Sequence, residues 1–134
     1  MKTFDVQSVG IDAPASQVFE FVAEPANLPR WTDAFKHADA RSAHLATPHG
    51  VVDIELGTDA QRKAGTVDWR MTFPDGAVGN AYSRVTPDGD SKSAYSFVLM
   101  APPVPLEALE GALEAQRRTL TAELVRLKKL LDAK

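Results

Sequence analysis

Apolar residues recur at sustained helical spacing in the last quarter of the chain. Leucines between positions 105 and 131 follow one another at steps of three, four or seven, which places them on one stripe of a helix. The stripe consists of Leu106, Leu109, Leu113, Leu120, Leu124, Leu127 and Leu131. Gln116 interrupts it. The pattern predicts a long C-terminal helix, with Pro105 in its first turn, whose apolar side needs a partner surface.

The N-terminal quarter predicts a strand followed by two short helices. Residues 3–11 are rich in Phe, Val and Ile, as strands are, and their apolar positions change parity near Ser8 and Gly10, which predicts a bulge. Pro14 suits the first turn of a helix whose buried side is formed by Val18, Phe19, Phe21 and Val22. The stretch from Pro25 to Trp31 is interrupted by prolines and predicts one further helical turn.

Regularly spaced turns between Trp31 and Pro103 predict five more strands, at about 35–45, 51–57, 66–73, 77–86 and 91–100. Residues 74–76 and 87–89 both read Pro-Asp-Gly, and each is predicted to form a three-residue turn. This register pairs Trp69 with Ala81, and Ala81 with Tyr95. The sheet is therefore predicted to have six antiparallel strands.

Directly paired residues share a face, so the register sorts the side chains of this sheet. One face carries small residues on its central strand, namely Ala77, Gly79, Ala81 and Ser83. Large residues flank them: Val67, Trp69, Met71, Phe73, Tyr95, Phe97 and Leu99. The result is a trough suited to a crossing helix or a bound apolar molecule. Polar residues occupy the predicted solvated face: Asp53, Glu55, Asp68, Arg70, Thr72, Asn80, Tyr82, Arg84 and Lys92.

The facing of the second predicted strand depends on its register. If Leu45 pairs with Val52, then the residues facing inward with Phe35 are His37, Asp39 and Arg41. A slip by one residue would instead turn inward Ala38, Ala40 and Ser42. A histidine beside a carboxylate is suited to proton transfer, which makes His37 and Asp39 candidate catalytic residues.

Composition excludes several classes of function. At 134 residues the chain is expected to form one domain, residues 1–134. Its net charge is -3 without a basic run, so nucleic acid is not an expected partner. The chain has no cysteine, and the spacing of His37, His44 and His49 matches no standard metal-ligand pattern. We therefore expect no metal and, without a glycine-rich phosphate loop, no cofactor. No apolar run is long enough to span a membrane, which predicts a cytoplasmic protein.

The segment from Ile11 to Val22, IDAPASQVFEFV, followed by PANLPRW at residues 25–31, resembles the opening of the START/SRPBCC superfamily. The predicted order of elements also resembles the helix-grip fold of that superfamily. The resemblance implies an α+β fold, in which a curved six-stranded antiparallel sheet grips the long C-terminal helix across its concave face. It also implies an apolar cavity between sheet and helix, as in polyketide cyclase/dehydrase-like and lipid-transport-like members.

Candidate ligand-binding residues are those that face the trough or the helix stripe: Trp31, Trp69, Met71, Ala81, Ser83, Tyr95, Phe97, Leu113, Gln116 and Leu120. A mostly apolar wall with a few polar atoms is typical of a small-molecule pocket. We therefore predict a carrier or sensor of a small apolar or aromatic molecule. One alternative is a polyketide cyclase/dehydratase-like enzyme that uses Tyr95, His37 or Asp39 as acid or base. Another is a module that binds a protein partner in the groove, and a homodimer is also compatible with the sequence.

Overall fold

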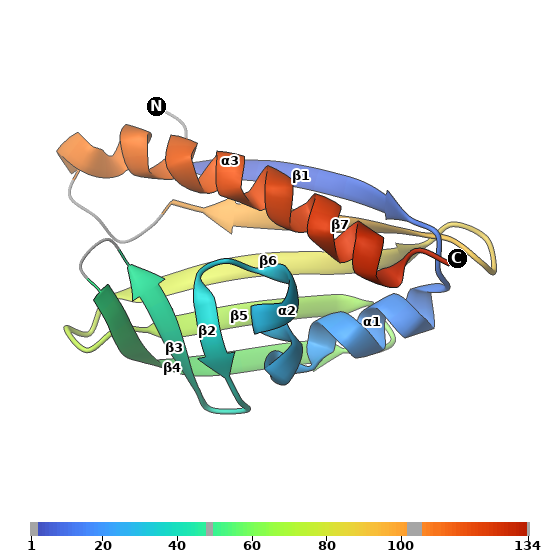
Figure 1. Cartoon of the computed structure of the whole chain (residues 1–134), viewed down its shortest axis with the longest axis horizontal. Helices are drawn as coiled ribbons and strands as arrows, with labels where there is room; N and C mark the ends of the chain where they lie inside the picture. Colours follow the sequence, from blue (N-terminus) through green and yellow to red (C-terminus); the bar gives the residue numbers. More distant parts are fainter. Residues whose placement is uncertain (1–2, 48–49, 102–105, 134) are drawn as a thin grey trace.

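A computed structural model of the chain describes residues 3–47, 50–101 and 106–133 (Figure 1). The expectation for Pro105, and those for the side chains of Leu106 and Leu109, lie outside the described part. In chain order, the elements are β1 (Phe4–Ile11), α1 (Ala15–Ala23), the 3-10 turn η1 (Pro25–Asn27), α2 (Leu28–Trp31), β2 (Phe35–Ala38), β3 (Ser42–Thr47), β4 (Gly50–Gln61), β5 (Thr66–Thr72), β6 (Val78–Pro87), β7 (Ser93–Met100) and α3 (Leu106–Leu131).

The sheet is antiparallel throughout and has the order β1-β7-β6-β5-β4-β3-β2. The helices lie against one face of the sheet (Figure 1). That inner face and the helices share one apolar core. From the helices this core takes Val18 and Val22 of α1, and the buried side of α3. The predicted leucine stripe is confirmed where its side chains are described, because Leu113, Leu120, Leu124, Leu127 and Leu131 are all buried.

The α+β class, the antiparallel sheet and the long C-terminal helix are confirmed, but the sheet has seven strands in the described residues and not six. The predicted strand 35–45 is in fact the hairpin β2–β3. Asp39 closes its turn, because the Oδ1 atom accepts the N–H groups of Arg41 at 2.9 Å and Ser42 at 2.8 Å. An aspartate side chain that binds the backbone two and three residues later forms such a turn without glycine or proline.

The register of the first Pro-Asp-Gly hairpin is confirmed, and that of the second is wrong by four residues. Trp69 pairs with Ala81 as predicted, but Ala81 pairs with Leu99, while Tyr95 pairs with Val85. The second turn is as long as the first but is centred on Asp90 and not on Asp88, since Pro87 pairs with Ser93 whereas Thr72 pairs with Val78 in the first hairpin. A shift by an even number keeps every side chain on its predicted face.

Two smaller expectations are also corrected. β1 pairs with β7 in one unbroken register, so there is no bulge near Ser8. The parity change arises because Phe4 and Val6 are exposed on the outer face, whereas Ile11 is buried. β4 continues past Gly57 to Gln61, because Gly57 pairs regularly with Arg70 and does not start a turn.

Candidate ligand-binding site

Four rings from separate parts of the chain meet on the inner face of the sheet. We call Trp31, Trp69, Tyr95 and Phe97 the aromatic cluster. Tyr95 lies at its centre, with ring centroids 6.2 Å from Trp31 and 6.4 Å from Phe97, both edge to face. Phe97 in turn stacks on Trp69 at 5.8 Å. Trp31 is placed by the short helix α2, and the other three rings by β5 and β7. The cluster thus joins the N-terminal helices to the middle of the sheet.

The polar atoms of the aromatic cluster have no hydrogen-bond partner among the described residues. Trp31 Nε1, Trp69 Nε1 and the Tyr95 hydroxyl are all buried and unpaired. Buried polar groups in folded proteins are nearly always paired, since an unmet one costs about 1 to 3 kcal/mol. Burial raises the pKa of the Tyr95 phenol, so the group stays protonated. The Ser83 hydroxyl lies near enough to oppose this shift, but it donates its own hydrogen bond to the Val67 carbonyl. The aromatic cluster therefore holds three hydrogen-bond donors in apolar surroundings.

Small residues line the sheet beside the cluster. Ala81 is paired with Trp69 on one side and Leu99 on the other, and Ser83 in the same way with Val67 and Phe97. Both small residues are buried, and the Ser83 hydroxyl donates to the carbonyl of Val67 at 2.6 Å. Met71, one of the predicted ligand contacts, is partly buried against the same core. The predicted arrangement of small residues between large ones is thus present on the inner face.

The helical residues predicted to face the ligand are placed differently from one another. Leu113 and Leu120 are buried. Gln116, however, is exposed, so the expectation of a buried amide there is wrong. Arg117 beside it is also exposed. Where the leucine stripe is interrupted, neither of these two side chains of α3 points into the core.

His37 and Asp39 do not reach the interior, which corrects the prediction that they face inward. Their side chains are 61% and 55% exposed, and His37 Nε2 lies 3.9 Å from Asp39 Oδ2. The N–H groups of Arg41 and Ser42 lower the pKa of Asp39, so its carboxylate stabilises the turn. Leu45 does pair with Val52, but the chain reverses between β2 and β3, so residues 37, 39 and 41 do not share one face. Of the three candidate catalytic residues, only Tyr95 lies in the aromatic cluster.

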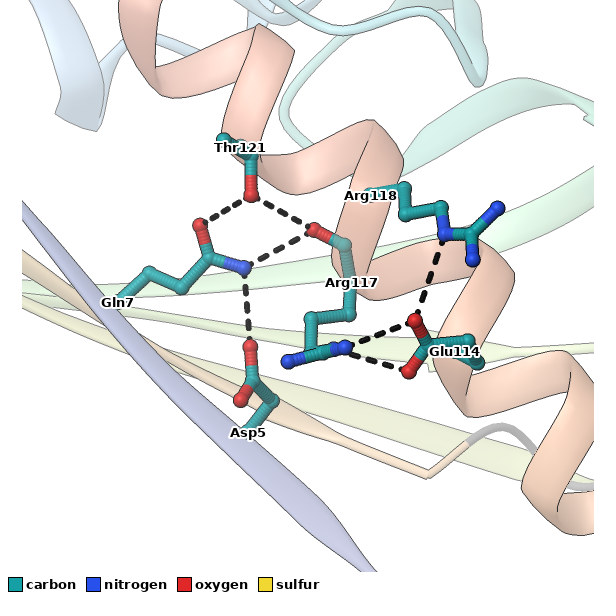
Figure 2. A network of polar contacts seen from close by, with 6 residues as sticks. All are labelled: Asp5, Gln7, Glu114, Arg117, Arg118 and Thr121. Atoms are coloured by element: carbon teal, nitrogen blue, oxygen red, sulfur yellow. Dashed lines mark hydrogen bonds and ion pairs between the residues drawn. The ribbon is translucent and has the colours of Figure 1, made fainter.

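A second polar arrangement, which the sequence did not indicate, joins β1 to α3 (Figure 2). The Gln7 amide donates to Asp5 and to the carbonyl of Arg117, both at 2.9 Å, and accepts the Thr121 hydroxyl at 2.9 Å. Glu114 holds Arg117 through two hydrogen bonds. These side chains line an open hollow of about 520 Å³.

A second open hollow, of about 550 Å³, lies beside Arg41, Glu55 and Arg70. Neither hollow is lined by the aromatic cluster.

The described residues contain no group of three His, Asp or Glu side chains that could hold a metal ion. Within the same part of the chain, none of the helices has the length and apolar character needed to cross a membrane.

An antiparallel sheet whose inner face packs on two short helices and a long C-terminal helix defines the START-like class of proteins. Within that class, the chain belongs to the family described as polyketide cyclase / dehydrase and lipid transport, which matches residues 5–132. No curated protein matches the sequence.

Solved structures of the same fold include XoxI from Bacillus cereus, with a TM-score of 0.71, 16% identity, and 97% of this chain and 96% of that chain covered. A START superfamily protein from Mycobacterium smegmatis has a TM-score of 0.67 and 13% identity, with 95% and 98% covered. The Zhui aromatase/cyclase from a Streptomyces species has a TM-score of 0.69 and 12% identity, with 96% and 92% covered. At these identities the similarity shows the fold alone.

The unpaired Tyr95 hydroxyl leads to a prediction about stability. The substitution Tyr95→Phe should raise the free energy of unfolding by about 1 kcal/mol, because it removes a buried polar group that has no partner. Tyr82→Phe is the matched control, since Tyr82 is 43% exposed on the outer face and should change stability by less than about 0.5 kcal/mol. Urea unfolding of the three proteins measures both effects. A clear loss of stability in Tyr95→Phe would mean that the hydroxyl is paired in solution.

Proposed function

We propose that this protein binds a small, mostly apolar molecule with oxygen acceptors at the aromatic cluster, as a carrier or sensor. The observation that carries the proposal is the set of three unpaired donors, Trp31 Nε1, Trp69 Nε1 and the Tyr95 hydroxyl. Carbonyl or ether oxygens of the ligand would accept from these donors, at most two donors to each oxygen, and the surrounding rings and leucines would hold the rest of the molecule by apolar contact. Residues 1–134 act as one domain in this proposal, because core residues range from Ile11 to Leu131.

Donors alone favour an oxygen-bearing ligand over a plain hydrocarbon. An aliphatic chain would leave the three groups unpaired, so it would gain nothing from them. The family description names both polyketide cyclases and lipid transport. The donors favour an oxygen-rich ligand of the polyketide kind over a lipid with a plain hydrocarbon chain. Access is a separate matter, because solvent does not reach any of the three donor atoms. A ligand can pair with them only after a covering segment moves.

Catalysis of the polyketide cyclase/dehydratase type is the second candidate, and one observation bears on it. A phenol whose pKa is raised by burial does not readily form the phenolate, so Tyr95 is unsuited to act as a base. It would instead polarise a carbonyl as a donor while the cavity orients the substrate. Of the other candidates, His37 and Asp39 are exposed and away from the rings. Binding without chemistry is therefore the simpler proposal.

Two probes of nearly the same shape separate donor recognition from apolar contact. We expect 2-acetylnaphthalene to bind about tenfold more tightly than 2-ethylnaphthalene, because only the ketone accepts hydrogen bonds, each of which contributes about 0.5 to 1.5 kcal/mol. Fluorescence titration measures both dissociation constants. In Tyr95→Phe the preference for the ketone should fall, whereas Tyr82→Phe should keep it. Equal affinity of the two probes for the unmodified protein would contradict recognition by the donors.

A further inference from the structure

Trp31 forms one side of the aromatic cluster, and the segment that follows it is attached to α3. The Thr32 backbone N–H and its hydroxyl both donate to the carbonyl of Leu28, at 2.9 and 2.7 Å, and close the end of α2. The next residue, Asp33, donates its backbone N–H to Glu123 Oε2 at 2.7 Å. Arg126, one helical turn further along α3, contacts Asp33 Oδ1 at 2.7 Å. The connection between α2 and β2 is thus held to the helix at two points.

The two attachments differ in their environment. Arg126 and Asp33 are 41% and 55% exposed, so water can replace their contact at little cost. Glu123 is only 9% exposed, which is unusual for a carboxyl group that has no ion-pair partner of its own among the described residues. Its hydrogen bond to the Asp33 N–H is therefore the attachment that depends on the state of the carboxyl group.

Burial raises the pKa of the Glu123 carboxyl to about 7. The Asp33 N–H opposes this shift, the Asp33 carboxylate adds to it, and the Arg126 guanidinium opposes it. These are the charged and polar groups that face Glu123 from the α2–β2 connection and from its own helix. A glutamate with this surrounding changes its charge near neutral pH.

We propose that Glu123 is a proton-controlled latch, which holds the α2–β2 connection, and with it Trp31, against the other rings of the aromatic cluster when protonated and releases them when ionised. The purpose of the latch rests on the proposed function, because opening it would give a ligand access to the donors. The latch itself is independent of any ligand. It rests on the cost of burying the charge of Glu123 in the closed state, which outweighs the preference of the Asp33 N–H for the carboxylate.

The direction of the pH effect follows from the two states of Glu123. In the closed state its pKa is about 7, and in an open state exposed to water it returns toward the ordinary 4.5. The closed state therefore holds its proton more tightly, and below pH 4.5 this adds its full amount to the free energy of opening. The added stability is lost as the pH rises from 4.5 to about 7, and above that the opening constant no longer changes with pH. Between about pH 5 and pH 8 the opening constant should rise by up to roughly 70-fold.

Amide hydrogen exchange at Asp33 measures this opening directly, because its N–H is the donor of the latch. After correction for the intrinsic exchange rate, the protection of the Asp33 amide should fall by up to roughly 70-fold from about pH 5 to pH 8. The amide of Val85, which donates to the carbonyl of Gly65 at 2.8 Å within the sheet, should keep its protection. A parallel loss at both amides would indicate global unfolding and would overturn the latch.

Glu123→Gln is the decisive variant, since glutamine can accept the same hydrogen bond but does not ionise. We expect the Asp33 amide of this variant to show the same protection at both pH values. Glu114→Gln is the matched control on the same helix, where Glu114 is 42% exposed and paired with Arg117, and it should keep the pH dependence of the original protein. If the protection of the Asp33 amide still depends on pH in Glu123→Gln, the proposal is overturned.

The outcome for the latch is separate from the outcome for the proposed function, because hydrogen exchange is measured without ligand. If the latch behaves as expected and 2-acetylnaphthalene does not bind, the proposed function fails and the latch stands. If the probe binds, its dissociation should be slower at about pH 5 than at pH 8, and Glu123→Gln should abolish the difference. Binding with equal dissociation rates would mean that the ligand enters elsewhere, which would overturn the latch as a gate.

Discussion

Replacing Leu127 by alanine should lower the free energy of unfolding by about 2 to 5 kcal/mol. Leu127 is 0% exposed and lies on the buried side of α3, about one turn before the helix ends, so the substitution leaves a cavity that the surrounding side chains cannot fill. A loss of this size is a large part of the stability of a small domain. Urea unfolding at constant pH measures the change.

Leu130→Ala supplies the control, because it makes the same substitution three residues away on the same helix. Leu130 is 43% exposed, so its replacement should cost less than about 1 kcal/mol. The helix propensity of the two variants is the same, and their difference reports only burial. Similar losses in both variants would contradict the assignment of the buried side of α3.

Gly65→Ala should lower the free energy of unfolding by about 2 to 4 kcal/mol, the second large effect we expect. Gly65 has a φ of +75°, in the left-handed region, and a Cβ atom there would lie 2.3 Å from the carbonyl oxygen of Val85. The turn between β4 and β5 would have to move away from β6, with loss of the hydrogen bond from the Val85 N–H to the Gly65 carbonyl.

Gly76→Ala separates the two causes of this loss. Gly76 has a similar φ of +88°, but a Cβ atom there meets nothing within 4 Å. It should therefore lose only the conformational part, about 1 to 2 kcal/mol. Urea unfolding of both variants gives the comparison. Equal losses would show that Gly65 is needed only for its backbone angle and not for the close approach of Val85.

The C-terminal helix could be predicted well because its signal is local. Five leucines at helical spacing, Leu113, Leu120, Leu124, Leu127 and Leu131, proved to be buried. The position of Gln116 was predicted wrongly. A leucine stripe predicts which side of a helix faces inward, but it does not predict how much of the helix the sheet covers. Near this turn α3 faces the hollow lined by Gln7 and Arg117. A polar side chain there can remain in water.

The strands were predicted less evenly, and the reason is the chemistry of their turns. Two identical Pro-Asp-Gly sequences sit at different places in loops of equal length. Phe73 donates to Ala77 on either side of the first tripeptide, whereas in the second loop Asp88, inside the tripeptide, donates to Lys92. The tripeptide marks a turn but does not determine where pairing resumes. The turn at Asp39 contains neither glycine nor proline, and alternating side chains on both sides of it gave the pattern of one continuous strand.

The inner face was predicted correctly, whereas the latch was not predicted at all. Trp69, Tyr95 and Phe97 are buried as expected, because alternation along a strand survives an even shift in register. Glu123 looks in the sequence like any surface glutamate of an amphipathic helix. Its partner Asp33 lies 90 residues earlier in the chain, and no local pattern connects the two.

The two indole N–H signals test the central claim most directly, because the chain has only two tryptophans. A nitrogen–proton correlation spectrum should show both indole protons, Trp31 and Trp69, without hydrogen bonds in the free protein. Adding 2-acetylnaphthalene should move at least one of them to higher proton shift as the ketone accepts its hydrogen bond, whereas 2-ethylnaphthalene should leave both without such a shift. Binding of the ketone with both indole signals unchanged would contradict the account.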